Sequence, residues 1–225
     1  MGNLNDHHLS VTWENVNLKV PIGSLLFDIL LDRTFEQRTF GPGQPVKTAQ
    51  KHSHGTYEVH FIVSGSGSLA IHDHNVEVRE STIHIIGPHI FHAFSQNQHD
   101  PITRFTFRFT CQESLTYEPW FPQTENEQIK NTLNGLTHCC LPDPNHKIIL
   151  LMEEIKNHLE HPSFGAYASA QSLMAYTLMQ IIRLLPRSDR KYTLPSKLKD
   201  EQRFPIVDNF FSRGYNKHLT VEMLA

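Results

Sequence analysis

Three histidines and one glutamate are spaced in this chain so that together they could hold one metal ion or one polar ligand. A single residue separates His52 from His54, and Glu58 follows His54 by four residues. Imidazole nitrogens and a carboxylate together suit a divalent first-row metal such as Zn, Fe, Mn or Ni. A fourth donor must come from elsewhere in the chain, and His92 is the best candidate.

Short β-strands must position these side chains. The segment 57–63 is rich in aromatic and β-branched residues, which predicts a strand. Alternate side chains of a strand share a face, so the two leading histidines and the glutamate are expected to point into one interior. We expect Tyr57 and His60 to lie on the opposite side, outside the pocket or against helices.

Two motifs resemble those of the cupin family. The pattern His-x-His-x-x-x-Glu, with six further residues before Gly65, is similar to the first cupin motif. The segment 85–92, which carries Pro88 and ends in a histidine, is similar to the second, although His89 stands where that motif has a glycine. The resemblance implies a cupin barrel (a double-stranded β-helix or jelly roll) with the four polar side chains inside it.

Many short strands with turns between them are expected on either side of these motifs, which is typical of a sandwich or barrel. Residues 1–20 are expected to form a loose start before them. The expected strands are 25–31, 33–40, 56–63, 67–72, 76–79, 82–86, 90–96 and 102–110. In the last of these, phenylalanines alternate with polar residues, so the Phe face should be buried. Arg104 and Arg108 lie on the other face, where they are candidates for binding an effector or, alternatively, ordinary surface residues.

Composition limits the class of protein. The chain has 225 residues, 39 % of them hydrophobic, which is enough for a packed core. A net charge of −3 does not suggest a protein that coats nucleic acid. Cys111, Cys139 and Cys140 form no disulfide framework and indicate reduced, structural thiols in a cytoplasmic protein. We find neither a signal peptide nor an apolar run of membrane-spanning length.

Beyond Cys111 the hydrophobic period changes from that of a strand to that of a helix. Helices are predicted at 125–136, 146–161 and 166–185, each with an apolar stripe. Such stripes can simply cover the apolar side of a barrel. The alternative for the pair 146–161 and 166–185 is that their generous apolar faces form a homodimer interface.

The end of the chain resembles the opening of the AraC-type DNA-binding domain. A charged stretch containing Pro195 precedes a predicted helix at 204–213, and Leu219 and Thr220 then begin a further helix. The order of barrel, helices, linker and this segment is similar to that of AraC-family transcription regulators. The resemblance implies that the helix-turn-helix begins at Thr220 and that its base-contacting helices lie beyond Ala225, so DNA would be bound only through residues outside this chain.

These features predict an α+β protein with four parts: a cupin-like sensory β-barrel (1–120), a helical dimerisation region (121–186), a linker (187–200) and the truncated start of an AraC-type DNA-binding domain (201–225).

The resemblance favours a non-enzymatic module that binds a small-molecule effector, often a sugar in this family. Effector-binding candidates are His52, His54, Glu58, His92, Arg104 and Arg108. Two alternatives for the first four are a metal site and a purely structural role. Trp13 and Trp120 are candidates for stacking on a sugar or for ordinary packing. The alternative function is a metal-dependent cupin enzyme, a dioxygenase or sugar isomerase, that uses the same four residues.

Overall fold

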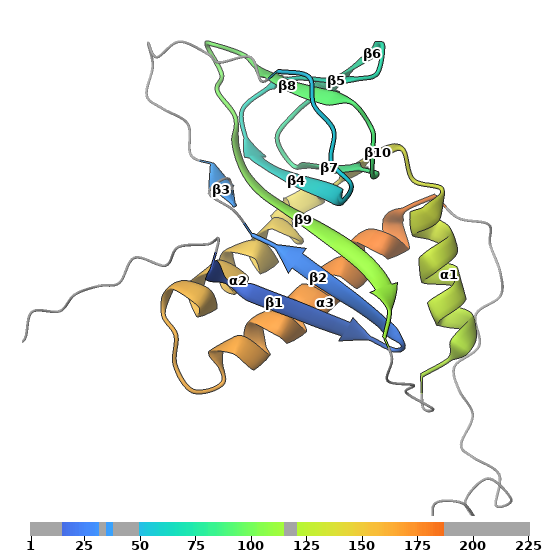
Figure 1. Cartoon of the computed structure of the whole chain (residues 1–225). Helices are drawn as coiled ribbons and strands as arrows, with labels where there is room; N and C mark the ends of the chain where they lie inside the picture. Colours follow the sequence, from blue (N-terminus) through green and yellow to red (C-terminus); the bar gives the residue numbers. More distant parts are fainter. Residues whose placement is uncertain (1–14, 32–34, 38–49, 115–120, 187–225) are drawn as a thin grey trace, which may run out of the picture. The chain divides into compact units, whose positions relative to one another are not determined.

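Two antiparallel sheets and a layer of helices make up the described part of the chain (Figure 1). The computed structural model describes residues 15–31, 35–37, 50–114 and 121–186. Trp13, Trp120, the linker and the segment around Thr220 therefore lie outside the described residues, as does most of the strand expected at 33–40. The fold class is α+β, as the sequence predicted.

In the described part of the chain most strands precede the helices, and one further strand lies between the first two α-helices. The strands are β1 (Asn17–Ile22), β2 (Leu25–Leu30), β3 (Glu36–Gln37), β4 (Tyr57–Ser64), β5 (Gly67–Ile71), β6 (His74–Val78), β7 (Thr82–Ile86), β8 (His92–Gln96), β9 (Thr103–Glu113) and β10 (His138–Pro142). The helices are α1 (Gln123–Asn134), α2 (Ile149–Glu160) and α3 (Ala166–Leu184), with a short 3₁₀ turn, η2 (Pro144–His146), before α2.

The larger sheet has the order β1-β2-β9-β4-β7-β10, with β3 also paired to β9, and the smaller has the order β6-β5-β8. Their strands β4 and β7 on one side and β5 and β8 on the other enclose a small apolar cluster: Ile62, Leu69, Ile71, Val78, Ile86, Phe94 and Ile102. This closed arrangement of short antiparallel strands is the cupin-like barrel.

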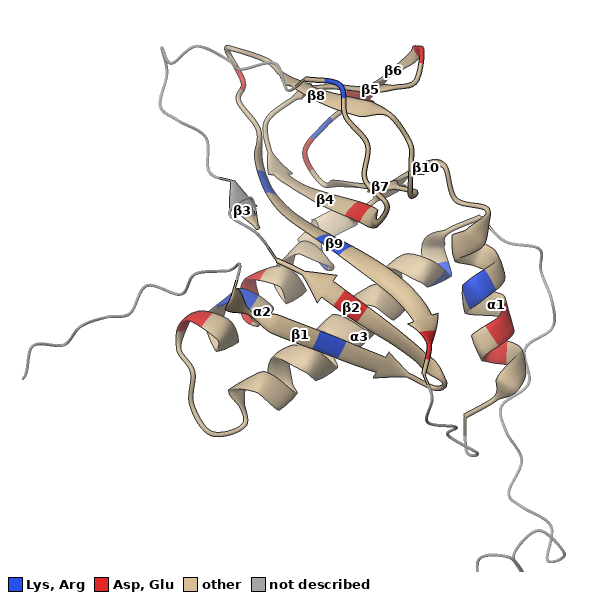
Figure 2. Ribbon diagram, in the orientation of Figure 1, with Lys and Arg blue, Asp and Glu red and all other residues tan. Residues whose placement is uncertain are grey.

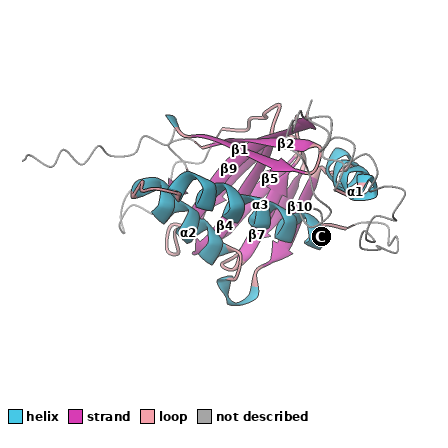
Figure 3. Ribbon diagram, turned by 90° about the horizontal axis from the view of Figure 1, so that it is seen from below, coloured by secondary structure: helices cyan, strands magenta, loops and turns pink. Residues whose placement is uncertain are grey.

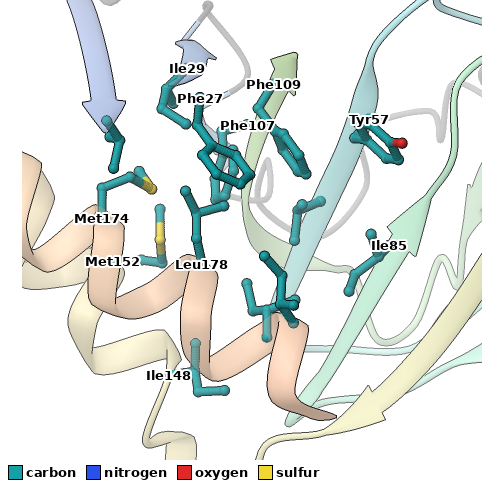
Figure 4. Packing of buried hydrophobic residues seen from close by; sticks show 14 of the residues in the cluster. Phe27, Ile29, Tyr57, Ile85, Phe107, Phe109, Ile148, Met152, Met174 and Leu178 are labelled. Atoms are coloured by element: carbon teal, nitrogen blue, oxygen red, sulfur yellow. The ribbon is translucent and has the colours of Figure 1, made fainter. Parts of the chain in front are cut away.

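The helices cover the other face of the larger sheet (Figure 3). Helix α3 packs along β1 and against α2, and α2 contacts β4. Their apolar stripes meet the phenylalanine face of β9 in the main core, where Phe107 and Phe109 face Met152 of α2 and Leu178 of α3 (Figure 4). The apolar stripes of the helices therefore cover the sheet, which was one of the two roles that the sequence predicted for them.

Strand β4 is covered on both of its faces. Its first six residues are all buried. Tyr57, Val59 and Phe61 belong to the main core under the helices, whereas Ile62 belongs to the apolar cluster inside the barrel. The strand therefore forms the wall between the barrel interior and the helical layer.

Two strands depart from the sequence prediction. The expected loose start at 1–20 contains most of β1, whose side chains alternate between exposed and buried and which pairs with β2 through a turn at Gly23 (φ +58°). Strand β10 lies inside the range 121–186 that was expected to be helical. It pairs with β7, about fifty residues earlier in the chain, and so adds a strand to the larger sheet after α1.

Helix α2 begins where a buried aspartate supplies its cap. Asp143 is 1 % exposed, and its carboxylate accepts hydrogen bonds from the backbone N–H groups of Ile148 and Ile149 at 2.9–3.0 Å. Because the first N–H groups of a helix have no partners within the helix, this contact stabilises the turn from β10 into α2.

Candidate functional site

Four side chains from three separate segments meet at one end of the barrel interior. Glu58 is the second residue of β4, His92 is the first of β8, and His52 and His54 lie in the segment that leads into β4. A pair of backbone hydrogen bonds between His52 and His92, at 3.0 and 2.9 Å, fixes the leading segment against β8. One donor atom from each of the four residues lies within 4.8 Å of the others, as the spacing predicted. We call these residues the His₃Glu cluster.

The carboxylate of Glu58 lies among the imidazoles. Its Oε2 is 2.8 Å from His92 Nε2 and 3.3 Å from His54 Nε2. Burial raises the pKa of this carboxyl, but the nearby His92, His60 and His54 outweigh that effect and lower it to about 2. Glu58 is therefore an anion at neutral pH, although only 8 % of the residue is exposed.

Backbone carbonyls orient two of the three imidazole rings. His52 Nδ1 lies 2.8 Å from the carbonyl oxygen of Gln50, and His92 Nδ1 lies 2.9 Å from that of Ile90. A carbonyl oxygen can only accept a hydrogen bond, so each Nδ1 carries the hydrogen when the ring is neutral. Each Nε2 then presents a lone pair to the cluster, which is the arrangement common among metal-binding histidines.

Several buried polar atoms at the cluster have no hydrogen bond of ordinary geometry. Among the described residues these atoms include Glu58 Oε2, His60 Nε2 and His92 Nε2. The 2.8 Å between Glu58 Oε2 and His92 Nε2 is an ion-pair distance; burial lowers the pKa of His92, but its contact with Glu58 outweighs burial and raises it. Buried polar atoms are usually satisfied. A divalent ion or the polar atoms of a ligand would satisfy them, and the donor set fits Zn, Fe, Mn or Ni.

The expectation that His60 lies outside the pocket is wrong. Residues 58 and 60 are two apart in the same strand, so their side chains share a face. His60 is 2 % exposed, its Nε2 is 3.5 Å from Glu58 Oε1, and its Nδ1 is 3.0 Å from the hydroxyl of Thr106. Burial lowers the pKa of His60 well below its ordinary value. His60 therefore stands as a neutral ring that can hold the second oxygen of Glu58. Tyr57 does lie outside the pocket, stacked on Phe109 at 4.8 Å.

Both arginines named from the sequence lie on the site's side of β9. The pairing of β4 with β9 places Arg108 opposite Glu58 and Arg104 opposite Ile62. Figure 2 shows the acidic position on β4 and the basic positions on the adjoining β9. The guanidinium of Arg104 lies over the Phe94 ring, 4.2 Å from its centroid. Burial lowers the pKa of Arg104 to about 10, so it remains a cation.

A second group of polar side chains continues from His60 across the barrel. His84 of β7 is opposite His60 in the strand pairing and is fully buried. Its Nδ1 is 3.3 Å from His138 Nε2, and its Nε2 is 3.8 Å from the sulfur of Cys140. Burial, followed by the charge of His138, lowers the pKa of His84 to about 4. Sequence reasoning missed this group because β10, which contributes two of its members, was not predicted.

Cys111 packs against the main core, and the described cysteines are all free thiols. His89, which replaces the glycine of the second motif, adopts the left-handed conformation (φ +62°) that glycine favours.

No helix in the described part of the chain is long and apolar enough to cross a membrane. The helical layer also exposes apolar side chains: Leu150, Phe164, Tyr167, Tyr176 and Leu184.

The barrel and its inward-facing cluster define a cupin-like ligand-binding domain. Residues 40–163 match the family model of the AraC-like ligand binding domain, and the chain belongs to that family. No curated protein sequence matches the chain.

Solved structures with similar folds are distant in sequence. AerE from Microcystis aeruginosa is 17 % identical (TM-score 0.27), and the match covers 42 % of each chain. Apo ToxT from Vibrio cholerae, crystallised as a point variant, is 9 % identical (TM-score 0.38), with 90 % of this chain and 69 % of that one covered. A cupin protein from Bacteroides fragilis is 19 % identical (TM-score 0.26), with 50 % and 87 % covered.

Proposed function

We propose that this chain is the effector-sensing and dimerisation part of an AraC-family transcription regulator. A small molecule, a sugar or a related metabolite, binds inside the barrel beside Glu58. The observation that carries the proposal is the double-sided burial of β4, with Glu58 and His60 on the site face and Val59 and Phe61 on the helix face. If the protein has a second conformation that differs at this strand, a ligand that binds the two conformations with different affinity would shift the equilibrium between them. The helices packed on the opposite face would respond.

The His₃Glu cluster gives this effector site its chemistry. His52, His54, Glu58 and His92 would hold a divalent metal, which would act as a Lewis acid toward oxygen atoms of the effector. Burial lowers the pKa of His54 and so favours the neutral ring that a metal requires. His60 acts here as a positioning residue, because it faces the carboxylate oxygen that does not point at His92.

Thermal unfolding of the whole chain tests the site. Zn²⁺ and a panel of sugars and related metabolites should raise the melting temperature of the wild type wherever they bind. A ligand that binds at the barrel site should no longer raise the melting temperature of Glu58→Gln. It should still raise that of Glu77→Gln, a matched change at an exposed glutamate on β6. Ligands that stabilise Glu58→Gln as strongly as the wild type would refute the proposed site.

Dimerisation through the helical layer is the second part of the proposal. Tyr176 and Leu184 of α3 are 49 % and 48 % exposed. They are eight residues apart, which places them about 80° apart around the helix, on one side. Large exposed apolar groups of this kind are typical of interfaces. Sedimentation should show a dimer for the wild type and a monomer for Tyr176→Arg/Leu184→Arg. A dimer that survives the double change would refute this surface.

DNA binding and location complete the proposal. The segment from Thr220 onward would begin an AraC-type helix-turn-helix, and the protein would act in the cytoplasm. The alternative, a metal-dependent cupin enzyme, has less support because the family match is to a ligand-binding domain. A turnover that chelators abolish would favour the enzyme.

A further inference from the structure

Helix α1 covers one end of the larger sheet with few apolar side chains (Figure 1). Three of its residues are buried: Asn126, Ile129 and Leu133. Polar contacts fasten the helix at two places. The side chain of Asn126 accepts a hydrogen bond from the backbone N–H of Ser24 at 3.3 Å and donates one to the hydroxyl of that residue at 2.7 Å. Lys130 forms an ion pair with Glu113 at the end of β9.

A pocket of about 60 Å³ remains where α1 meets β2, β4 and β9. The residues that line it include Leu25, Tyr57, Cys111, Glu113, Lys130 and Leu133. Leu25, Tyr57 and Leu133 belong to the main core, so the inner wall of the pocket is largely apolar. Tyr57 precedes Glu58 in β4, and adjacent side chains of a strand point to opposite faces. The pocket therefore lies on the helix side of β4, whereas the His₃Glu cluster lies on the barrel side.

Tyr57 brings an unused hydroxyl group to the lining of this pocket. Its ring stacks on Phe109, and Figure 4 shows the oxygen pointing away from the rings of Phe107 and Phe109. Among the described residues this hydroxyl has no hydrogen-bond partner, although Tyr57 is only 9 % exposed. Polar groups of buried side chains are usually hydrogen-bonded. A polar atom of a molecule in the pocket would supply the missing partner.

The charges around the pocket favour an uncharged occupant. Burial raises the pKa of Tyr57, with a smaller contribution from Cys111. Burial also raises the pKa of Cys111 to about 11, although Lys130 opposes this effect. The hydroxyl and the thiol are therefore both neutral at pH 7. Lys130 and Glu113 are exposed at the rim and neutralise each other. A charged ligand would find no free counter-charge on the inner wall, and burying an unpaired charge is costly.

The volume of the pocket limits how much of a ligand it can enclose. A cavity of about 150 Å³ is enough to hold benzene. The present pocket would therefore enclose one edge of such a ring against Leu25 and Leu133, and the remainder would lie at the open rim beside Lys130. An oxygen on the enclosed edge would be available to the hydroxyl of Tyr57.

We propose that the pocket between α1 and the sheet is a second binding site, which takes a small uncharged molecule with an apolar body and one oxygen atom. Phenol is the simplest aromatic member of this class. Tyr57 is the residue that recognises the oxygen. The inference goes beyond the proposed effector site and does not depend on it, because the two sites lie on opposite faces of β4.

Alkylation of the whole chain by iodoacetamide, followed by peptide mass spectrometry, tests the inference, because Cys111 lines the pocket and reports its occupancy. Saturating phenol should slow the alkylation of Cys111 at least fivefold. The rates at Cys139 and Cys140 should stay unchanged, since these two residues lie on β10 and do not line the pocket.

Toluene is the matched probe, because a methyl group replaces the hydroxyl of phenol on the same ring. From the concentration dependence of protection, toluene should bind at least threefold more weakly than phenol. Tyr57→Phe should weaken phenol at least threefold and leave toluene unchanged, and the unchanged toluene binding would show that the variant is folded. The control is Tyr176→Phe, at an exposed tyrosine on α3, which should keep the preference of the wild type.

Three outcomes would overturn the inference. Phenol that fails to protect Cys111, or that protects all three cysteines equally, removes the site. A preference for phenol over toluene that survives Tyr57→Phe removes the role of the hydroxyl. Benzoate that protects Cys111 more strongly than phenol, through an effect that Lys130→Gln abolishes, overturns the uncharged class of ligand. The barrel site of the proposed function stands in each case, because none of these residues belongs to it.

Discussion

Replacing Glu58 by glutamine should destabilise the metal-free protein by an amount that depends on pH. The carboxyl has a pKa of about 2 in the folded chain against an ordinary value of 4.5. Each pKa unit corresponds to about 1.4 kcal/mol, so ionised Glu58 contributes roughly 3 kcal/mol at neutral pH. Glutamine keeps the shape but loses the charge that attracts His92 and His54.

The direction of the pH dependence follows from the lowered pKa. A carboxyl with a lowered folded-state pKa stabilises the protein above pH 4.5, and this contribution is lost as the pH falls toward 2. One unit below 4.5, the unfolded chain is largely protonated at this group while the folded chain is not. The stability difference between wild type and Glu58→Gln should therefore shrink by about 1.4 kcal/mol between pH 7 and pH 3.5.

Urea unfolding at a series of pH values measures this difference in the presence of a chelator. Glu77→Gln is the control, because Glu77 is exposed on β6 and pairs only with Arg79 among the partners described. Its difference from the wild type should be small at every pH. A gap between wild type and Glu58→Gln that stays constant from pH 7 to pH 3.5 would show that the carboxylate gains no stability from the imidazoles, and the account of the cluster would be wrong.

Three other changes test the framework around the site. Because the pKa of His84 is lowered to about 4 in the folded chain, its contribution to stability is present above pH 6.5 and is lost as the pH falls toward 4. This contribution should fall by about 1.4 kcal/mol between pH 8 and pH 5.5. In denaturant titrations, His84→Gln should therefore reduce the dependence of stability on pH. Gly65→Ala should cost about 2 kcal/mol or more, because Gly65 has φ +87° and a Cβ there would strike the Pro101 carbonyl; an unchanged urea midpoint would contradict this. Asp143→Ala removes the cap of α2 and should lower stability by about 1–2 kcal/mol, with a smaller loss for Asp143→Asn; equal losses would show that the cap is not the cause.

The local pattern of the sequence was sufficient to predict the His₃Glu cluster. The short spacing from His52 to Glu58 sets which side chains share a face, and the second motif places His92 beside them. The strands from 56 to 110 and the three helices were also predictable, because each has a clear hydrophobic period. The prediction that His60 lies on the opposite face from Glu58 was wrong. It could have been avoided from the sequence, since side chains two residues apart in a strand share a face.

Strands β1 and β10 were harder to predict for a physical reason. β1 alternates polar and apolar residues, but its segment is short and polar at its start. β10 reads His-Cys-Cys-Leu-Pro and becomes a strand because β7 offers it an open edge. That edge is made by residues about fifty positions away, so no local window contains the cause. The placement of His138 and Cys140 beside His84 depends on the same distant pairing.

The position of β10 late in the chain also affects the order in which the larger sheet can fold. The larger sheet joins β2 to β9 and β7 to β10, so its partners are separated by long stretches of chain. Such topologies fold slowly, because loop-closure entropy must be overcome before the contacts form. On a ribosome, the edge of β7 stays open until residues 138–142 have emerged, and β4 lacks its helical cover until α2 and α3 follow. Nascent chains that stall between residues 114 and 138 should therefore be the species most prone to aggregate and to need chaperones.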